Sequence, residues 1–250
     1  MLSTGILVRI CLSTVLLASL SGCGDGSSGA PAEQQAPPPP PPLLIEKRLR
    51  ILALGDSYTI GEGVQPAERW PVQLAELLRK GGVFVNDPDI TARTGWTTRD
   101  LLTGIEWNKQ PGPYNLVTLL IGVNNQFRGR SEDEYRAEFV SLLKKAVELA
   151  DGKTPRVVVL SIPDWGATKF AEGQDRARIG AAIDRFNAIN KEETKKAGAA
   201  YVDVTPISRT AEKDPTLLAA DGLHPSGKMY AEWARLALPA AREALNEGKR

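Results

Sequence analysis

The stretch Leu116-Val-Thr-Leu-Leu-Ile-Gly122, LVTLLIG, is a strongly apolar run of strand length that leads into two asparagines. Runs of this kind are typical of parallel strands that are covered on both faces. Other segments of strand length occur at 50–55, 90–93, 156–162 and 200–204. Segments with apolar residues at helical spacing occur between or after them, at 131–149, 175–197 and from about 226 onward. This alternation predicts an α/β fold with a doubly wound parallel sheet in a three-layer α/β/α sandwich.

The composition of the 250-residue chain is that of an ordinary globular protein, with 42% hydrophobic and 24% charged residues. Its 31 basic and 30 acidic residues leave a formal net charge of +1. The charged residues fall mostly in the predicted helices, which indicates solvated helix faces. The sequence gives no sign of the clustered basic face that nucleic-acid binding requires, so we expect no nucleic-acid partner.

Residues 1–22 are predicted to be a signal peptide and not part of the fold. Arg9 precedes a mostly apolar run, 10–20, which has the length of a signal-peptide core and is too short to span a bilayer. The run ends in Leu20-Ser-Gly-Cys23, which resembles the bacterial lipoprotein box. The resemblance implies that Cys23 is the first mature residue and carries lipid, which anchors the protein to a membrane of the cell envelope, on its periplasmic or outer side. Cleavage of a plain secretory signal nearby is the alternative.

Residues 23–49 are predicted to form a disordered tether, because this Gly-, Ser- and Pro-rich segment has almost no apolar side chain to bury. The six prolines 37–42 favour an extended polyproline II conformation. Cys11 leaves with the signal peptide, so the mature monomer has one cysteine and no disulfide. The remaining segment, 50–247, has the length of one domain and must be stabilised by its core alone.

Four short loops carry polar residues at or near the carboxyl ends of the predicted strands, where functional groups of parallel sheets gather. Each loop has a simple structural explanation. Ser57 could cap a helix, Gly95 could form a turn, and the turn 221–224 could leave its histidine exposed. Taken singly, these explanations are favoured. For Asn124, which follows the LVTLLI strand, a structural and a functional role are equally good explanations.

Together, the four loops contain the parts of a serine hydrolase site. A serine nucleophile requires an imidazole to take its proton and a carboxylate to orient that imidazole. Ser57 follows the first predicted strand, and His224, the only histidine in the chain, lies three residues after Asp221. Backbone N–H groups and an asparagine amide can receive the negative charge that develops on a carbonyl oxygen. Their joint occurrence in one order indicates catalysis more strongly than any single group does.

The four blocks resemble those of the SGNH hydrolases, the GDSL-like lipases, esterases and acylhydrolases, over roughly residues 50–245. The letters S, G, N and H of that name fall on Ser57, Gly95, Asn124 and His224, with the aspartate of the family at Asp221. The resemblance implies a flavodoxin-like fold with a five-stranded parallel sheet. It also implies hydrolysis of carboxylic esters through an acyl-enzyme, without a metal or another cofactor. Ser57, Asp221 and His224 would be catalytic, and the oxyanion hole would consist of Ser57, Gly95 and Asn124.

Two positions depart from the pattern of the family. Tyr58 stands where the name GDSL has leucine, which leaves the nucleophile in place. Asn125 stands where the third block commonly has an aspartate that is regarded as structural. We expect this second change to alter hydrogen bonding within the loop and the placement in a subfamily, and to affect catalysis less.

The blocks are not separated by long insertions, so we expect an open, shallow site for short-acyl or lysolipid-like esters. A carbohydrate O-deacetylase that acts on envelope polysaccharide is the alternative, so the substrate is a small-molecule, lipid or glycan ester. The aromatic residues near the loops could form a sugar platform or an acyl groove, or could plug the rim of the domain; they are Tyr58, Trp96, Phe127 and Trp165.

Two other classes of protein fit the sequence less well. A non-catalytic envelope-binding module with a relic site would be expected to lack one of Ser57, Asp221 and His224, and all three are present. A nucleotide-binding Rossmann domain would carry G-x-G-x-x-G after its first strand, whereas this chain has GDSYTIG. The oligomeric state does not follow from the sequence.

Overall fold

The computed structural model describes residues 48–246. The predicted signal peptide, the predicted lipidation site Cys23 and most of the predicted tether lie outside the described residues and stay predictions. Leu49, the last residue of that tether, packs against the core, and its backbone N–H donates a hydrogen bond to the carbonyl of Phe84 at 2.8 Å. Within the described part, no helix is both long and apolar enough to cross a membrane.

Five parallel strands form one sheet in the order β2-β1-β3-β4-β5, which confirms the predicted fold class. The strands are β1 Ile51–Gly55, β2 Asp89–Ala92, β3 Leu116–Leu120, β4 Val157–Leu160 and β5 Ala200–Val202. Strands β1, β3 and β4 are buried along their whole length, which explains their strongly apolar sequences. The register places Leu119 of β3 opposite Leu54 of β1 and Val159 of β4.

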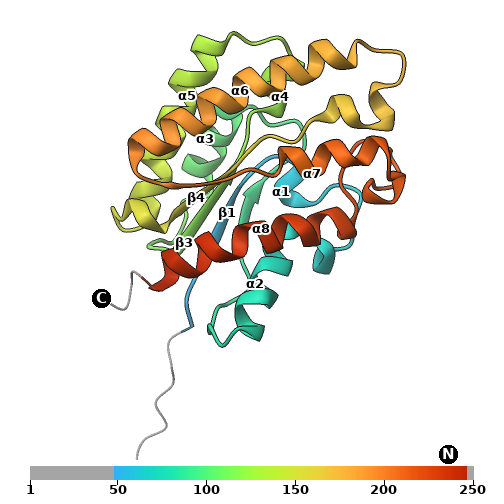
Figure 1. Cartoon of the computed structure of the whole chain (residues 1–250). Helices are drawn as coiled ribbons and strands as arrows, with labels where there is room; N and C mark the ends of the chain where they lie inside the picture. Colours follow the sequence, from blue (N-terminus) through green and yellow to red (C-terminus); the bar gives the residue numbers. More distant parts are fainter. Residues whose placement is uncertain (1–47, 247–250) are drawn as a thin grey trace, which may run out of the picture. The chain divides into compact units, whose positions relative to one another are not determined.

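Helices cover both faces of the sheet (Figure 1). One face carries α2 Trp70–Lys80 and α8 Gly227–Asn246, and the other carries α3 Thr98–Trp107, α5 Glu132–Leu149 and α6 Arg176–Ala197. Helices α5, α6 and α8 agree with the predicted helices to within about one residue. Helix α2 was not predicted, although Trp70, Leu74 and Leu78 recur at a spacing of four and are fully buried.

Three short helices begin within three residues of the end of a strand and place polar residues at its carboxyl edge. They are α1 Ser57–Ile60 after β1, α4 Val123–Phe127 after β3 and α7 Thr205–Arg209 after β5. Single 3-10 turns occupy Pro66–Glu68, Thr154–Arg156, Trp165–Ala167, Lys169–Ala171, Thr210–Glu212 and Pro215–Leu217. We expected the loop with His224 to follow the fifth strand. In the structure it does not follow β5 directly. Helix α7 and two 3-10 turns lie between them.

Candidate active site

Ser57 is the first residue of α1, at the end of the buried strand β1. The residue that caps this helix is Asp56, whose Oδ1 accepts a hydrogen bond from the backbone N–H of Tyr58 at 3.0 Å. The interpretation of Ser57 as the helix cap was therefore wrong. Because Asp56 caps the helix, the hydroxyl of Ser57 remains available to another partner.

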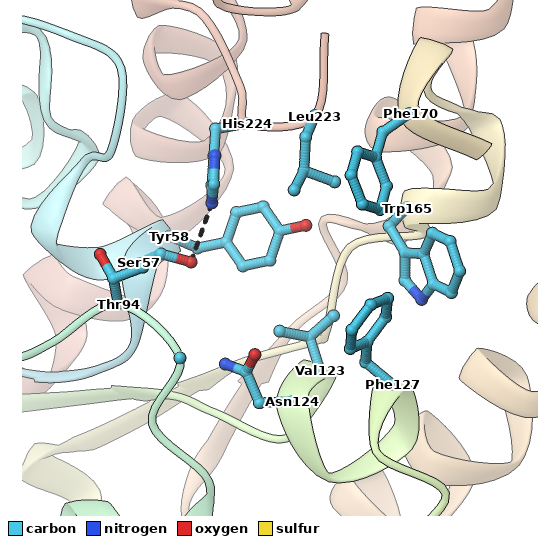
Figure 2. A pocket seen from close by; sticks show the side chains of 11 residues that line it. Ser57, Tyr58, Thr94, Val123, Asn124, Phe127, Trp165, Phe170, Leu223 and His224 are labelled. Carbon is cyan, nitrogen blue, oxygen red and sulfur yellow. Dashed lines mark hydrogen bonds between the residues drawn. The ribbon is translucent and has the colours of Figure 1, made fainter. Parts of the chain in front are cut away.

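That partner is His224. Its Nε2 atom lies 2.9 Å from Ser57 Oγ (Figure 2). On the other side of the ring, Nδ1 lies 2.6 Å from Asp221 Oδ2. An imidazole that donates its Nδ1 hydrogen to a carboxylate presents Nε2 as an acceptor for the serine hydroxyl. His224 is only 8% exposed, so the interpretation as an exposed turn histidine was also wrong.

Asp221 is held by the turn that contains it. Its Oδ1 accepts hydrogen bonds from the backbone N–H groups of Leu223 and His224, both at 2.9 Å, while Oδ2 binds the imidazole. Burial raises the pKa of Asp221, but the hydrogen bonds from the His224 ring and from these two N–H groups outweigh it and hold the pKa below its ordinary value. Asp221 is therefore an ionised acceptor that can fix the orientation of the ring.

The other two predicted site residues line the same cavity as Ser57 and His224. Gly95 has a φ of +81°, a left-handed conformation that favours glycine. The side-chain amide of Asn124 donates one N–H to the carbonyl of Trp96 at 2.9 Å. An amide nitrogen carries two hydrogens, so one remains for a ligand in the cavity. The structure thus brings together all five residues that were predicted to form the site.

Helix α4 binds the loop that carries Gly95 at several points. Besides the bond of Asn124 to Trp96, the guanidinium of Arg128 donates to the carbonyl of Gly95 at 2.6 Å. Asn125 Oδ1 accepts from the backbone N–H of Thr98 at 3.0 Å. Helix α4 therefore fixes the position of Gly95 relative to Asn124. The sequence did not identify Arg128, since a surface arginine after a short helix carries no local signal.

The sequence of the chain matches one known protein family. Residues 53–232 match the model of the GDSL-like Lipase/Acylhydrolase family. The chain belongs to this family. It is an SGNH hydrolase and an ester-bond hydrolase, and no curated protein sequence matches it.

Several solved structures share this fold. The structure of TesA has 18% sequence identity and a TM-score of 0.61, with coverage of 78% of this chain and 99% of that one. Axe2, an acetylxylan esterase from Geobacillus stearothermophilus, has 21% identity and a TM-score of 0.60, with coverage of 77% and 94%. The esterase EstA from Pseudoalteromonas sp. has 18% identity and a TM-score of 0.55, with coverage of 79% and 94%. At these identities the similarity establishes the fold.

The asparagine that departs from the common GDSL-like pattern takes part in a directional hydrogen-bond chain. Asn125 is 1% exposed, and its amide nitrogen donates to Thr98 Oγ1 at 2.6 Å. That hydroxyl in turn donates to Glu138 Oε2 at 2.5 Å. A hydroxyl has one hydrogen to donate, so a buried acceptor at Glu138 requires a donor at position 125. The amide at Asn125 and the carboxylate at Glu138 are therefore a matched pair.

Asn125→Asp is expected to lower the free energy of unfolding by about 1–3 kcal/mol, because one buried carboxylate oxygen loses its donor. Urea unfolding of the full chain measures the change. Adding Glu138→Gln restores a donor on the far side of Thr98, so the double variant should lose less stability than the sum of the single losses. Full stability of Asn125→Asp, or additive losses, would contradict the matched pair.

Asp56 is a second carboxylate at the site, and it is fully buried. Its Oδ2 has no hydrogen-bond partner among the described residues. Burial raises the pKa of Asp56 to about 7, although backbone hydrogen bonds from Tyr58 and from its own N–H oppose the rise. In the folded protein, Asp56 therefore holds its proton at a pH where an exposed aspartate has lost it.

The raised pKa predicts a pH-dependent stability difference between the native protein and the variant Asp56→Asn. Below the ordinary aspartate pKa of 3.8, both folded and unfolded states are protonated. Between 3.8 and about 7 only the unfolded state loses its proton, so the native protein loses stability as pH rises, and the full loss stands above 7. Asparagine does not titrate and keeps an acceptor for the N–H of Tyr58. As pH rises through this range, the urea midpoint of Asp56→Asn should therefore rise relative to that of the native protein.

The control for this experiment is Asp133→Asn, at an exposed position in the first turn of α5. Its stability difference from the native protein should not follow the same trend. A pH-independent difference for Asp56→Asn would show that Asp56 titrates alike in both states.

The cavity beside Ser57 has a volume of about 200 Å³ and mostly apolar walls. Tyr58 and Trp165 line it as buried side chains, with 3% and 5% exposure, and Phe127 lies at its edge with 55% exposure. Trp96 is not among its lining residues and packs over Gly104 of α3 instead. Phe170, which the sequence did not indicate, is 46% exposed and completes a cluster with Trp165 and Phe127 (Figure 2).

Residues 48–246 hold no group of three or more histidine, cysteine, aspartate or glutamate side chains in reach of one metal ion. The polar groups around Ser57 are instead those of proton transfer and oxyanion binding.

Proposed function

We propose that this hydrolase cleaves carboxylic esters through an acyl-enzyme on Ser57, with His224 as general base and Asp221 as its orienting acid. The observation that carries the proposal is the continuous contact from Ser57 Oγ to His224 Nε2, at 2.9 Å, and from His224 Nδ1 to Asp221 Oδ2, at 2.6 Å. A serine hydroxyl is a weak nucleophile unless a base accepts its proton during attack.

In the first half of the reaction, Ser57 Oγ attacks the ester carbonyl as its proton passes to His224 Nε2. The negative charge on the carbonyl oxygen is received by the backbone N–H groups of Ser57 and Gly95 and by the free amide N–H of Asn124. The imidazolium then protonates the oxygen of the leaving alcohol, and the C–O bond of the ester breaks. An acyl group remains on Ser57.

In the second half, water takes the place of the alcohol. His224 accepts a proton from this water as it attacks the acyl carbonyl, and the same donors receive the oxyanion. Collapse of the intermediate returns the proton to Ser57 Oγ and releases the carboxylic acid. Asp221 stays ionised throughout and stabilises the imidazolium in both halves.

The substrates that fit best are short-acyl or lysolipid-like esters. A volume of about 200 Å³ is smaller than the roughly 300–1,000 Å³ of pockets for drug-sized ligands, which favours a short group in the cavity. Phe127 and Phe170 are exposed at its edge, so an apolar chain could continue along them. A cluster of exposed aromatic side chains next to a nucleophile is a suitable surface for such a chain.

Deacetylation of a glycan is the second candidate. A larger basin of about 690 Å³ shares Phe127 and Trp165 with the cavity. Its remaining walls include the polar side chains Gln126, Arg130, Gln174, Asp175, Arg178 and Arg185. Such donors and acceptors could bind the hydroxyl groups of a sugar while an acetyl group enters the small cavity. Axe2, which shares the fold, is an acetylxylan esterase, and this activity fits the second candidate.

A fluorophosphonate tests the proposed mechanism, because it phosphonylates an activated serine. Mass spectrometry should locate the label on Ser57, and labelling should block hydrolysis of a short p-nitrophenyl ester. A panel of lysolipids, short-chain esters and acetylated oligosaccharides then separates the two candidates by kcat/KM. Labelling of another residue, or hydrolysis that survives labelling, would reject the assignment of Ser57.

A further inference from the structure

Tyr58, which stands where the name GDSL has leucine, forms part of the cavity wall next to the proposed nucleophile. Its side chain is 3% exposed. The ring packs against His224, at a centroid distance of 5.4 Å, and against Trp233 of α8, at 6.1 Å. These two neighbours restrict the position of the ring.

The hydroxyl of Tyr58 is directed into the cavity (Figure 2). Among residues 48–246, the hydrogen bond that Tyr58 forms is from its backbone N–H to Asp56, and its hydroxyl is not bonded to a protein atom. The facing walls are apolar, since they consist of Val123, Phe127, Trp165, Phe170 and Leu223. Water in the open cavity can reach this hydroxyl. A group that enters the cavity displaces that water, and an apolar group would then leave the hydroxyl unpaired at a cost in free energy.

This hydroxyl acts as a hydrogen-bond donor. Burial raises the pKa of Tyr58 above its ordinary value, and the nearby carboxylates of Asp56, Asp221 and Asp164 raise it further. The phenol therefore keeps its proton over the whole range in which an ester hydrolase works. The complementary group on a ligand is an acceptor oxygen, such as that of an ether, a hydroxyl or a carbonyl.

We propose that Tyr58 is a specificity-determining residue whose hydroxyl donates a hydrogen bond to an oxygen in the part of the substrate that fills the cavity. The inference rests on the proposed function, because it takes the cavity beside Ser57 as the substrate site. It narrows the substrate class to esters in which this part is oxygenated. A plain hydrocarbon group would leave the hydroxyl unpaired and would bind less well in the transition state.

The test compares Tyr58→Phe with the native full chain on pairs of ester substrates. Within each pair, an oxygen in one ester replaces one CH₂ group of the other. One pair is p-nitrophenyl methoxyacetate and butyrate, and a second spacing is given by 3-methoxypropionate and valerate. A third pair, 2-methoxyethyl acetate and butyl acetate, places the oxygen in the alcohol. In at least one pair, the substitution should lower the oxygenated-to-hydrocarbon ratio of kcat/KM by about three- to tenfold, as expected for one neutral hydrogen bond. The pair that responds identifies the part of the substrate in the cavity.

Comparing ratios between proteins removes the intrinsic reactivity of each ester, which is the same for both enzymes. Tyr230→Phe is the matched control, because this tyrosine of α8 is fully buried, its hydroxyl has no partner within residues 48–246, and it does not line the cavity. It should leave all three ratios unchanged. Thermal unfolding checks that both variants are folded.

Two different failures can be told apart. If Tyr58→Phe changes both members of every pair by the same factor, the hydroxyl does not contact substrate and the inference is overturned. If Ser57→Ala retains turnover, the proposed function fails instead, whatever the behaviour of Tyr58→Phe.

Discussion

Replacing Ser57 with alanine should lower kcat for a short p-nitrophenyl ester by on the order of 10⁴–10⁶-fold and abolish labelling by a fluorophosphonate. Among the described residues, the substitution removes the only atom that lies within hydrogen-bond distance of His224 Nε2. Without it, no acyl-enzyme can form, and the remaining donors can only stabilise direct attack by water. Steady-state rates and intact-protein mass spectrometry measure the two effects.

Ser141→Ala is the matched control for this substitution. Ser141 lies on the exposed side of α5, where its hydroxyl donates to the carbonyl of Ala137 within the helix. Its loss should change neither turnover nor labelling. A Ser57→Ala protein that still hydrolyses the ester, or still takes the label, would place the nucleophile elsewhere.

Replacing Asn124 with alanine should lower kcat by about 10²–10³-fold with a much smaller change in KM. The amide would contact the carbonyl oxygen most strongly when that oxygen carries negative charge, so its removal acts on the transition state rather than on the bound ester. Separate measurement of kcat and KM distinguishes this role from simple substrate binding.

Asn124 also binds the carbonyl of Trp96, so its removal could act by loosening the loop with Gly95. Arg128→Met separates the two effects, because it removes the bond to the carbonyl of Gly95 and leaves the amide in place. We expect Arg128→Met to cost far less in kcat than Asn124→Ala. Equal losses would assign the effect to loop position, and an unchanged kcat in Asn124→Ala would remove this residue from the oxyanion hole.

The sequence predicted those elements whose signal is local. Strand β3 is a strongly apolar run and α6 has a regular apolar stripe, so both appear close to their predicted bounds. The groups around Ser57 were found because each follows a strand or lies in a short turn. Parallel topology then brings strand ends that are distant in sequence to one edge of the sheet.

Features that depend on tertiary packing were not predictable in this way. The burial of Trp165 depends on contacts with Phe127 and Phe170, from two different segments. The fully buried state of Asp56 has no sequence signal, because an aspartate in that place serves equally well as an exposed helix cap. The match between Asn125 and Glu138 spans two helices, and only the direction of each hydrogen bond reveals it.

The acid and base of the site are three residues apart, whereas Ser57 and His224 are separated by 167 positions. Synthesis proceeds from the N-terminus, so a growing chain that has reached the end of α6 already contains Ser57, Gly95 and Asn124. It contains no imidazole at all, because the only histidine lies beyond that point. By the proposed mechanism, the nascent enzyme cannot hydrolyse esters until most of its polypeptide has left the ribosome and its C-terminal part has docked beside β1.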